Sequence, residues 1–374
     1  MPPPAALRRT DPPFQPSPSP GAAARVFFGG PDRPARYLRD LLEARVEAVP
    51  PGGEILWATY YFRDERLAEA LARARRRGVA VMLALEGHPR LRTANDAVIR
   101  RLARPDGLGA GLRVVRHALP AHLHEKLYCF SHPRPVALVG SFNPSGNEPE
   151  DPAVIRAIRD QDRGHNVLVE LAEPALVAGL AAHARWVHGS RHGLLERFAP
   201  ELNAPLCAGG LQVHFFPRRQ ADPLDRLLRA LRPRAGVGAG AGARLRVASS
   251  HLRDGGMVAR LAALAAGGVR VEILAEATTR RVPRRVERRL RAGGAVFRRY
   301  LHPQGLPMHN KFLLADGPQG SWLAFGSFNL TRSSRWLNHE ILAVTEDSGL
   351  FDAFARRWEE MVAEPWTVAA EPGR

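Results

Sequence analysis

The chain carries the same set of motifs twice. A His-x-Lys triplet begins at His124 and again 185 residues later at His309, and a Gly-Ser-Phe-Asn tetrapeptide begins at Gly140 and again 186 residues later at Gly326. An internal repeat with constant order and spacing indicates that each copy is one structural unit. The sequence therefore predicts two similar lobes in one chain, packed face to face with one site between them.

The segments around the motifs also repeat in type and order. Apolar runs predict strands over 26–28, 54–61 and 79–85 in the first half, and over 213–216, 244–249 and 269–274 in the second. Helical spacing of apolar residues predicts helices over 36–49, 64–77, 222–231 and 255–266. Alternation of strands and helices is typical of an α/β fold.

Composition shifts give the expected domain boundaries. Residues 1–24 are rich in proline and serine and are predicted to form a disordered tail. A Pro/Ala/Gly-rich stretch near 200–210 separates the repeats. We therefore expect an N-terminal lobe over 25–200 and a C-terminal lobe over 211–366. Because both half-sites lie in one chain, we expect a monomer.

Charge points to an anionic partner and singles out two lysines. The chain has 54 Lys and Arg against 37 Asp and Glu, a net charge of +17. This suits nucleic acid, an anionic membrane surface or a phosphorylated substrate, although general arginine abundance explains it equally well. Lys126 and Lys311 are the only lysines, and both stand in the His-x-Lys triplets. These two positions therefore need a compact ammonium group that arginine does not replace.

Other features exclude several protein classes. Cys129 and Cys207 are too few for a disulfide framework. No apolar run approaches the ~20 residues of a membrane-spanning helix, and the N-terminus lacks the apolar core of a secretory signal. We expect a cytoplasmic protein, with peripheral contact to an anionic membrane left open.

The doubled motifs predict a phosphate site. Alternation along a strand puts His124 and Lys126 on one face, and likewise His309 and Lys311. Uncharged donors follow in each half, namely Ser141, Asn143, Ser327 and Asn329. One imidazole can attack phosphorus while the other protonates the leaving oxygen and then activates water or an alcohol. Lysine and asparagine stabilise the phosphoryl oxygens, so neither a metal nor a cofactor is required.

This pattern resembles the phospholipase D superfamily, whose signature is H-x-K-x4-D followed by G-S-x-N. The second copy also supplies Asp316, Asn338 and Glu340 at signature positions. The resemblance covers roughly residues 25–366. It implies two lobes related by a pseudo-two-fold axis, each a mixed sheet flanked by helices, and metal-independent phosphodiester chemistry through a phosphohistidine. It also implies that a carboxylate such as Glu340 orients a histidine.

The first copy departs from the signature. Ser131 occupies the acidic position, and Asn166 matches Glu340 if residues 166–171 align with 340–345. We expect this departure to affect the orienting partner of the first half rather than its His-Lys pair. Tyrosyl-DNA phosphodiesterases of the same superfamily also lack the aspartate, so its loss is compatible with activity.

Several residues have alternative interpretations. Asp316 can brace a turn with Gly317, Glu340 can be an ordinary strand residue, and Trp336 can pack in the core or form a rim. His122 and His165 are more typical of supporting histidines. The arginine-rich run over 280–291 predicts a cationic helix, which either grips phosphates or is simply solvated.

Three functions remain open. Phospholipid hydrolysis or transphosphatidylation is favoured; a nuclease or DNA-processing phosphodiesterase, and a catalytically inactive phosphate-binding protein, are the alternatives. A long basic groove would favour nucleic acid, and a short pocket with an apolar rim would favour lipid. The sequence does not assign the nucleophile to either histidine.

Overall fold

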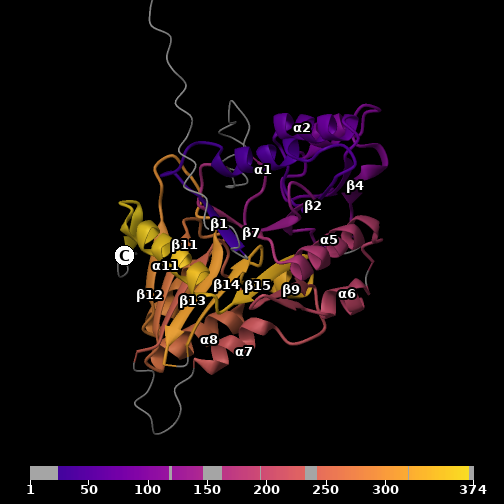
Figure 1. Ribbon diagram of the computed structural model, residues 1–374. Helices are drawn as coiled ribbons and strands as arrows, with labels where there is room; N and C mark the ends of the chain where they lie inside the picture. The colour runs from indigo at the N-terminus through magenta and orange to yellow at the C-terminus, as the bar shows by residue number, and fades with distance from the viewer. Residues whose placement is uncertain are drawn as a thin grey trace, which may run out of the picture.

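The first half of the chain forms a mixed seven-stranded sheet. The computed structural model describes residues 24–117, 120–145, 162–193, 195–231, 242–318 and 320–369 (Figure 1), so all but the last residue of the tail predicted over 1–24 lies outside the described residues. The strands are β1 (Ala24–Gly29), β2 (Glu54–Thr59), β3 (Ala80–Glu86), β4 (Leu112–Val115), β5 (Lys126–Phe130), β6 (Val136–Gly140) and β7 (Asn166–Leu171). Their order is β1-β7-β6-β5-β2-β3-β4, with β2, β3 and β4 parallel.

The second half forms a nine-stranded sheet with the same central order. Its strands are β8 (Leu206–Ala208), β9 (Leu211–Phe216), β10 (Arg244–Ser249), β11 (Arg270–Glu276), β12 (Val296–Tyr300), β13 (Lys311–Gly317), β14 (Gly320–Gly326), β15 (Glu340–Thr345) and β16 (Thr367–Ala369). Their order is β16-β12-β11-β10-β13-β14-β15-β9-β8. Without the two edge strands this order matches the first sheet strand for strand. The predicted duplicated α/β fold is confirmed.

Helices cover the outer face of each sheet. The first sheet carries α1 (Tyr37–Glu47), α2 (Glu65–Arg76) and α3 (Asp96–Leu102), and the second carries α7 (Pro223–Ala230), α8 (Gly255–Ala266) and α9 (Arg284–Ala292). Asp64 begins α2 by accepting a hydrogen bond from Leu67 N, and Asp254 begins α8 by accepting from Gly256 N and Met257 N. An aspartate is a favourable N-cap because its carboxylate satisfies the free amides of the first turn.

Two longer helices lie between the sheets and give the lobes a common core. They are α5 (Pro174–Gly189) and α11 (Ser348–Ala363), which pack with the inner faces of both sheets (Figure 1). The ring of Phe354 on α11 lies 5.0 Å from Phe28 of the first sheet and 5.1 Å from Phe312 of the second. A helix of one half therefore helps to fix the position of the other half. Short helices α6 (Pro200–Asn203) and α10 (Arg332–Trp336) complete the fold.

Three expected strands are shorter than predicted. The strand predicted over 54–61 ends at Thr59, and the strands that follow the histidines begin only at the lysines, Lys126 and Lys311. His124 and His309 therefore precede their strands, in segments that bridge to the other lobe. Within the described residues, no helix is both long and apolar enough to cross a bilayer.

Candidate active site

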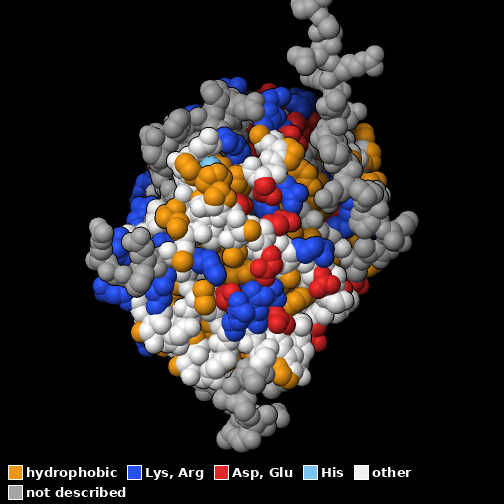
Figure 2. Space-filling view, turned by 90° about the vertical axis from the view of Figure 1, so that its left-hand side faces the viewer, with side chains coloured by type: hydrophobic (Ala, Val, Ile, Leu, Met, Phe, Trp, Pro, Cys, Tyr) orange, Lys and Arg blue, Asp and Glu red, His pale blue; other side chains and the backbone are white. Residues whose placement is uncertain are grey.

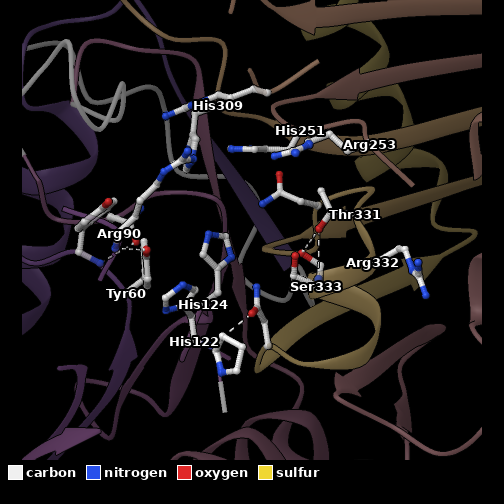
Figure 3. A pocket seen from close by; sticks show the side chains of 17 residues that line it. Tyr60, Arg90, His122, His124, His251, Arg253, His309, Thr331, Arg332 and Ser333 are labelled. Carbon is white, nitrogen blue, oxygen red and sulfur yellow. Dashed lines mark hydrogen bonds between the residues drawn. The ribbon is translucent and has the colours of Figure 1, made fainter. Parts of the chain in front are cut away.

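The two histidines of the repeated triplets line one cavity of about 510 Å³. In Figure 3, His124 and His309 point into it from opposite sides. Main-chain hydrogen bonds cross between the lobes at this point: His124 N donates to His339 O and His309 N donates to His165 O, both at 2.9 Å. Each histidine segment is thus held by the residue just before a strand of the other lobe. His339 precedes β15, and His165 precedes β7. The expected meeting of two imidazoles in one cavity is what the structure has.

The lysines are buried beside these histidines. Lys126 Nζ donates to His124 O at 2.6 Å, and Lys311 Nζ donates to His309 O at 2.5 Å. The ammonium group of Lys126 also lies 5.4 Å from the centre of the Tyr60 ring. Neither lysine is among the cavity-lining residues, but each ammonium group is fixed beside its own histidine by bonding that histidine's main chain.

Each imidazole is oriented by a side chain of the opposite lobe. His124 Nδ1 lies 2.9 Å from Glu340 Oε2, and His309 Nδ1 lies 2.9 Å from Asn166 Oδ1. The alignment of Asn166 with Glu340 agrees with this geometry, because both begin equivalent strands. The departure of the first copy from the signature therefore concerns the partner of His309, since Asn166 faces that histidine and His124 keeps a carboxylate.

The serines of the repeated tetrapeptides hold these orienting side chains. Ser141 Oγ accepts from Val167 N at 3.0 Å and donates to Asn166 Oδ1 at 3.2 Å. Ser327 Oγ accepts from Ile341 N at 3.0 Å and donates to Glu340 Oε2 at 2.6 Å. Each hydroxyl donates one hydrogen bond to the orienting oxygen, and the second lone pair of that oxygen can accept a hydrogen bond from histidine Nδ1. Neither serine lines the cavity.

The glycines of the tetrapeptides are required by a close backbone approach. A Cβ at Gly140 would lie 2.0 Å from Val167 O, and one at Gly326 would lie 2.2 Å from Ile341 O. Gly326 also has φ of +145°, which side chains disfavour. This approach lets the serine reach the neighbouring strand.

The asparagines of the tetrapeptides do line the cavity. Asn143 Oδ1 accepts from Tyr61 N at 3.3 Å. Asn329 Oδ1 is buried and has no hydrogen-bond partner among the described residues. Two side-chain amides therefore face the space between the imidazoles, where they can donate to anionic oxygens.

Four predicted candidates lie elsewhere. Asp316 is at the far end of β13, where its carboxylate accepts from Arg246 Nη2 at 2.5 Å, and Ser131 accepts from Glu54 N at 2.7 Å. His165 is buried, and its Nδ1 lies 3.0 Å from Arg357 Nη2. Trp336 is 46 % exposed and does not line the cavity. The structure thus does not bring Asp316 to the histidines.

Further cavity residues were not singled out from the sequence, namely Arg90, Arg253, Tyr60 and His251 (Figure 3). Two more arginines line the cavity, Arg332 and Arg281, and Arg281 belongs to the arginine-rich run over 280–291. Tyr60 and His251 follow equivalent strands, β2 and β10, so position after a strand end was the available signal. Among the described residues, the lining holds no aliphatic side chain apart from Pro120.

Burial sets the protonation of the central groups. Burial, together with the charges of Lys126 and Lys311, holds the pKa of His124 and of His309 well below the usual range. Burial raises the pKa of Glu340 to about 7. The imidazoles are therefore neutral near pH 7, and Nε2 carries the lone pair wherever Nδ1 donates.

A family profile matches both halves of the chain. Residues 52–149 and 239–362 match the profile described as cardiolipin synthase, PLD-like domain. Both matched ranges include a His-x-Lys triplet and a Gly-Ser-Phe-Asn tetrapeptide. No curated protein sequence matches the chain.

Solved structures share the fold at low sequence identity. Phosphatidylserine synthase from Haemophilus influenzae Rd KW20 is similar with a TM-score of 0.64 and 12% identity, over 92% of this chain and 87% of that one. Polyphosphate kinase from Porphyromonas gingivalis is similar with a TM-score of 0.58 and 14% identity, over 91% of this chain. The chain spans only 50% of the length of that kinase. Identity this low carries the fold and not the activity.

Proposed function

Because the chain belongs to the phospholipase D superfamily, with cardiolipin synthase-like PLD domains, we propose that it cleaves or transfers phosphodiesters through a covalent phosphohistidine. The observation that carries this proposal is the pair of oriented imidazoles, His124 on Glu340 and His309 on Asn166, in one cavity. Two imidazoles with fixed Nδ1 partners present two Nε2 atoms for proton transfer and attack on phosphorus.

The unequal orienting partners support different roles for the two histidines. Glu340 can bear a negative charge next to His124, and this charge stabilises the positive phosphohistidine that forms when Nε2 attacks phosphorus. Asn166 is neutral, so it gives no such support to a cation on His309. A histidine without a carboxylate partner releases a proton more readily. His124 is therefore the nucleophile and His309 the acid and base.

The proposed reaction has two steps. First, His309 takes up a proton on Nε2 when the anionic phosphodiester binds, because the substrate's negative charge favours the imidazolium. His124 Nε2 then forms a bond to phosphorus, the bond between phosphorus and the leaving oxygen breaks, and His309 Nε2 gives its proton to that oxygen. Second, His309 takes a proton from water or an alcohol, whose oxygen bonds phosphorus as the phosphorus–nitrogen bond breaks. Asn143, Asn329 and the two lysines stabilise the negative oxygens throughout.

A burst experiment tests the assignment. Bis(p-nitrophenyl) phosphate has a leaving group that needs little protonation, so His309→Asn should release about one p-nitrophenolate per chain and then stall. His124→Asn should show no burst. The matched control is His122→Asn, in the same cavity, which should turn over repeatedly. A burst in His124→Asn, or a phosphoryl group recovered on His309 after quenching in base, would overturn the assignment.

We propose phospholipid as the first substrate class. The family profile is that of a cardiolipin synthase-like domain, and the similar fold of a phosphatidylserine synthase covers most of both chains. Incubation with labelled phosphatidylglycerol and phosphatidylcholine, followed by quenching in base, should leave label on histidine. An added alcohol should then yield a new phosphatidyl ester in the wild type and none in His124→Asn.

Nucleic acid is the second candidate, favoured by the arginines of the cavity. The cavity lining includes Arg90, Arg253, Arg281 and Arg332 and, within the part of the chain that the structure describes, almost no aliphatic side chain. An acyl chain would need apolar contact. On the face in Figure 2, however, arginines alternate with carboxylates rather than forming a stripe. Label transfer from single-stranded DNA but from neither lipid would favour this candidate. Binding of a phosphodiester without label transfer from any substrate would favour an inactive binding protein.

A further inference from the structure

Three histidines and one glutamate gather outside the cavity. His117 follows β4, His192 and Glu196 lie in the segment after α5, and His339 directly precedes β15. One donor atom of each lies within 4.8 Å of one donor atom of every other. His339 Nε2 is 2.9 Å from Glu196 Oε2, and His192 Nδ1 is 3.5 Å from Glu196 Oε1. The proposed reaction uses none of these side chains.

The three imidazole rings form a nearly equilateral triangle. Their centres lie 5.1 Å apart for His117 and His192, 5.3 Å for His117 and His339, and 5.3 Å for His192 and His339. In a tetrahedral zinc site the Zn–N bonds are about 2.0–2.1 Å, which puts ring centres about 3.2 Å from the ion and about 5.2 Å from each other. The spacing in the structure agrees with that geometry.

The cluster is closed to solvent and only partly satisfied by hydrogen bonds. The side chains are 5%, 1%, 8% and 1% exposed for His117, His192, Glu196 and His339. His117 Nε2 and His192 Nδ1 are buried and have no hydrogen-bond partner among the described residues. Buried polar atoms of this kind call for an explanation, of which an ion is one. His192 also has φ of +51°, a conformation that non-glycine residues adopt mainly where the surroundings hold them.

From this geometry we infer that the chain binds one structural Zn²⁺ ion, with the ligands His117, His192, Glu196 and His339. Imidazole nitrogen with one carboxylate oxygen is a donor set that zinc accepts, and four protein ligands leave no open position for catalysis. The ion would take the place of the proton between His339 Nε2 and Glu196. The proton of the neutral imidazole would then be on His339 Nδ1. Glu125 Oε1 lies 4.0 Å from that Nδ1 and would take the outer position common beside metal-bound histidine.

The ion would connect three distant segments at a point next to the active site. His339 lies between Asn338, which lines the cavity, and Glu340, which orients His124. Its main chain bonds both His122 and His124. The proposed zinc thus fixes the segment that carries the orienting carboxylate, without contact to the substrate. The expectation that the reaction needs no metal is unaffected.

Metal content of the full chain, prepared without an affinity tag, tests the inference. After dialysis against ZnCl₂ and then buffer, elemental analysis should find about one zinc per chain. Glu196→Gln keeps the size and a hydrogen-bond acceptor for His339 but is a poor ligand, and it should weaken zinc binding by at least about 10-fold, as should His192→Ala. Removing zinc with a chelator should lower the melting temperature of the wild type.

A matched control comes from another buried histidine. His214 Nδ1 lies 2.9 Å from Arg218 Nη1 and belongs to no candidate group of metal ligands among the described residues, so His214→Asn should keep its zinc. Wild-type protein that remains free of zinc after dialysis would overturn the inference and leave a hydrogen-bonded network only. Full zinc retention by both Glu196→Gln and His192→Ala would overturn it as well. Neither result would bear on the phosphohistidine reaction, which the burst experiment tests separately.

Discussion

Replacing Glu340 by glutamine isolates the carboxylate behind the proposed nucleophile. Glu340 is fully buried and accepts from Ser327 Oγ at 2.6 Å and from Ser334 Oγ at 2.7 Å, in addition to its contact with His124. Glutamine keeps the size but removes the negative charge. Its amide can also donate to Nδ1, which forces the histidine proton onto Nε2 and blocks attack on phosphorus.

The size of the effect follows from the contact distance. His124 Nδ1 and Glu340 Oε2 are 2.9 Å apart, so the charge centres of an imidazolium and the carboxylate are about 4 Å apart. Opposite unit charges at that distance interact by about 4 kcal/mol at an effective dielectric constant of about 20. Each 1.36 kcal/mol of lost transition-state stabilisation costs a factor of about ten. We therefore expect Glu340→Gln to lower kcat by about 10³-fold.

The assay is steady-state release of p-nitrophenolate from bis(p-nitrophenyl) phosphate, with melting temperature recorded for each variant. The control is Glu170→Gln, another buried carboxylate, which pairs with Arg45 rather than with a histidine. The control should keep kcat within about threefold of wild type. If Glu340→Gln stays folded and also keeps kcat within about threefold, the carboxylate does not support a cationic intermediate, and the assignment of His124 fails.

Three further outcomes are expected. Asp316→Asn should leave kcat unchanged and cost about 0.5–1 kcal/mol of stability in chemical denaturation, because its partner Arg246 lies outside the cavity and the aspartate is a third exposed; a large loss of kcat would contradict that placement. Gly140→Ala should lower the free energy of unfolding by about 1–3 kcal/mol or more, because the added Cβ meets Val167 O. An unchanged melting temperature would refute the argument. The pKa of His309 is lowered by burial from 6.5, so the unfolded chain binds a proton more readily, and wild-type stability should fall as pH decreases below about 6.5. His309→Asn should show a smaller fall in a melting series from pH 7 to 5, and an equal fall would show that other groups cause it.

The repeat in the sequence was enough to predict the fold class and the two His-Lys pairs. Local order carries this information, since apolar periodicity specifies strands and helices and the doubled motifs specify equivalent positions in two lobes. The two lysines are informative for a chemical reason that is also local. They are kept in a chain that otherwise uses arginine.

Only the tertiary structure decided which residues serve which histidine. The contacts that orient His124 and His309 join residues 216 and 143 positions apart in the sequence, and they cross from one lobe to the other. Motif order within a lobe gives no information about such a crossing, so the sequence did not show which histidine Asn166 or Glu340 orients. The same holds for Asp316, which shares a strand with Lys311 but lies at its other end, and for His339, whose histidine neighbours are brought to it by packing of the two lobes.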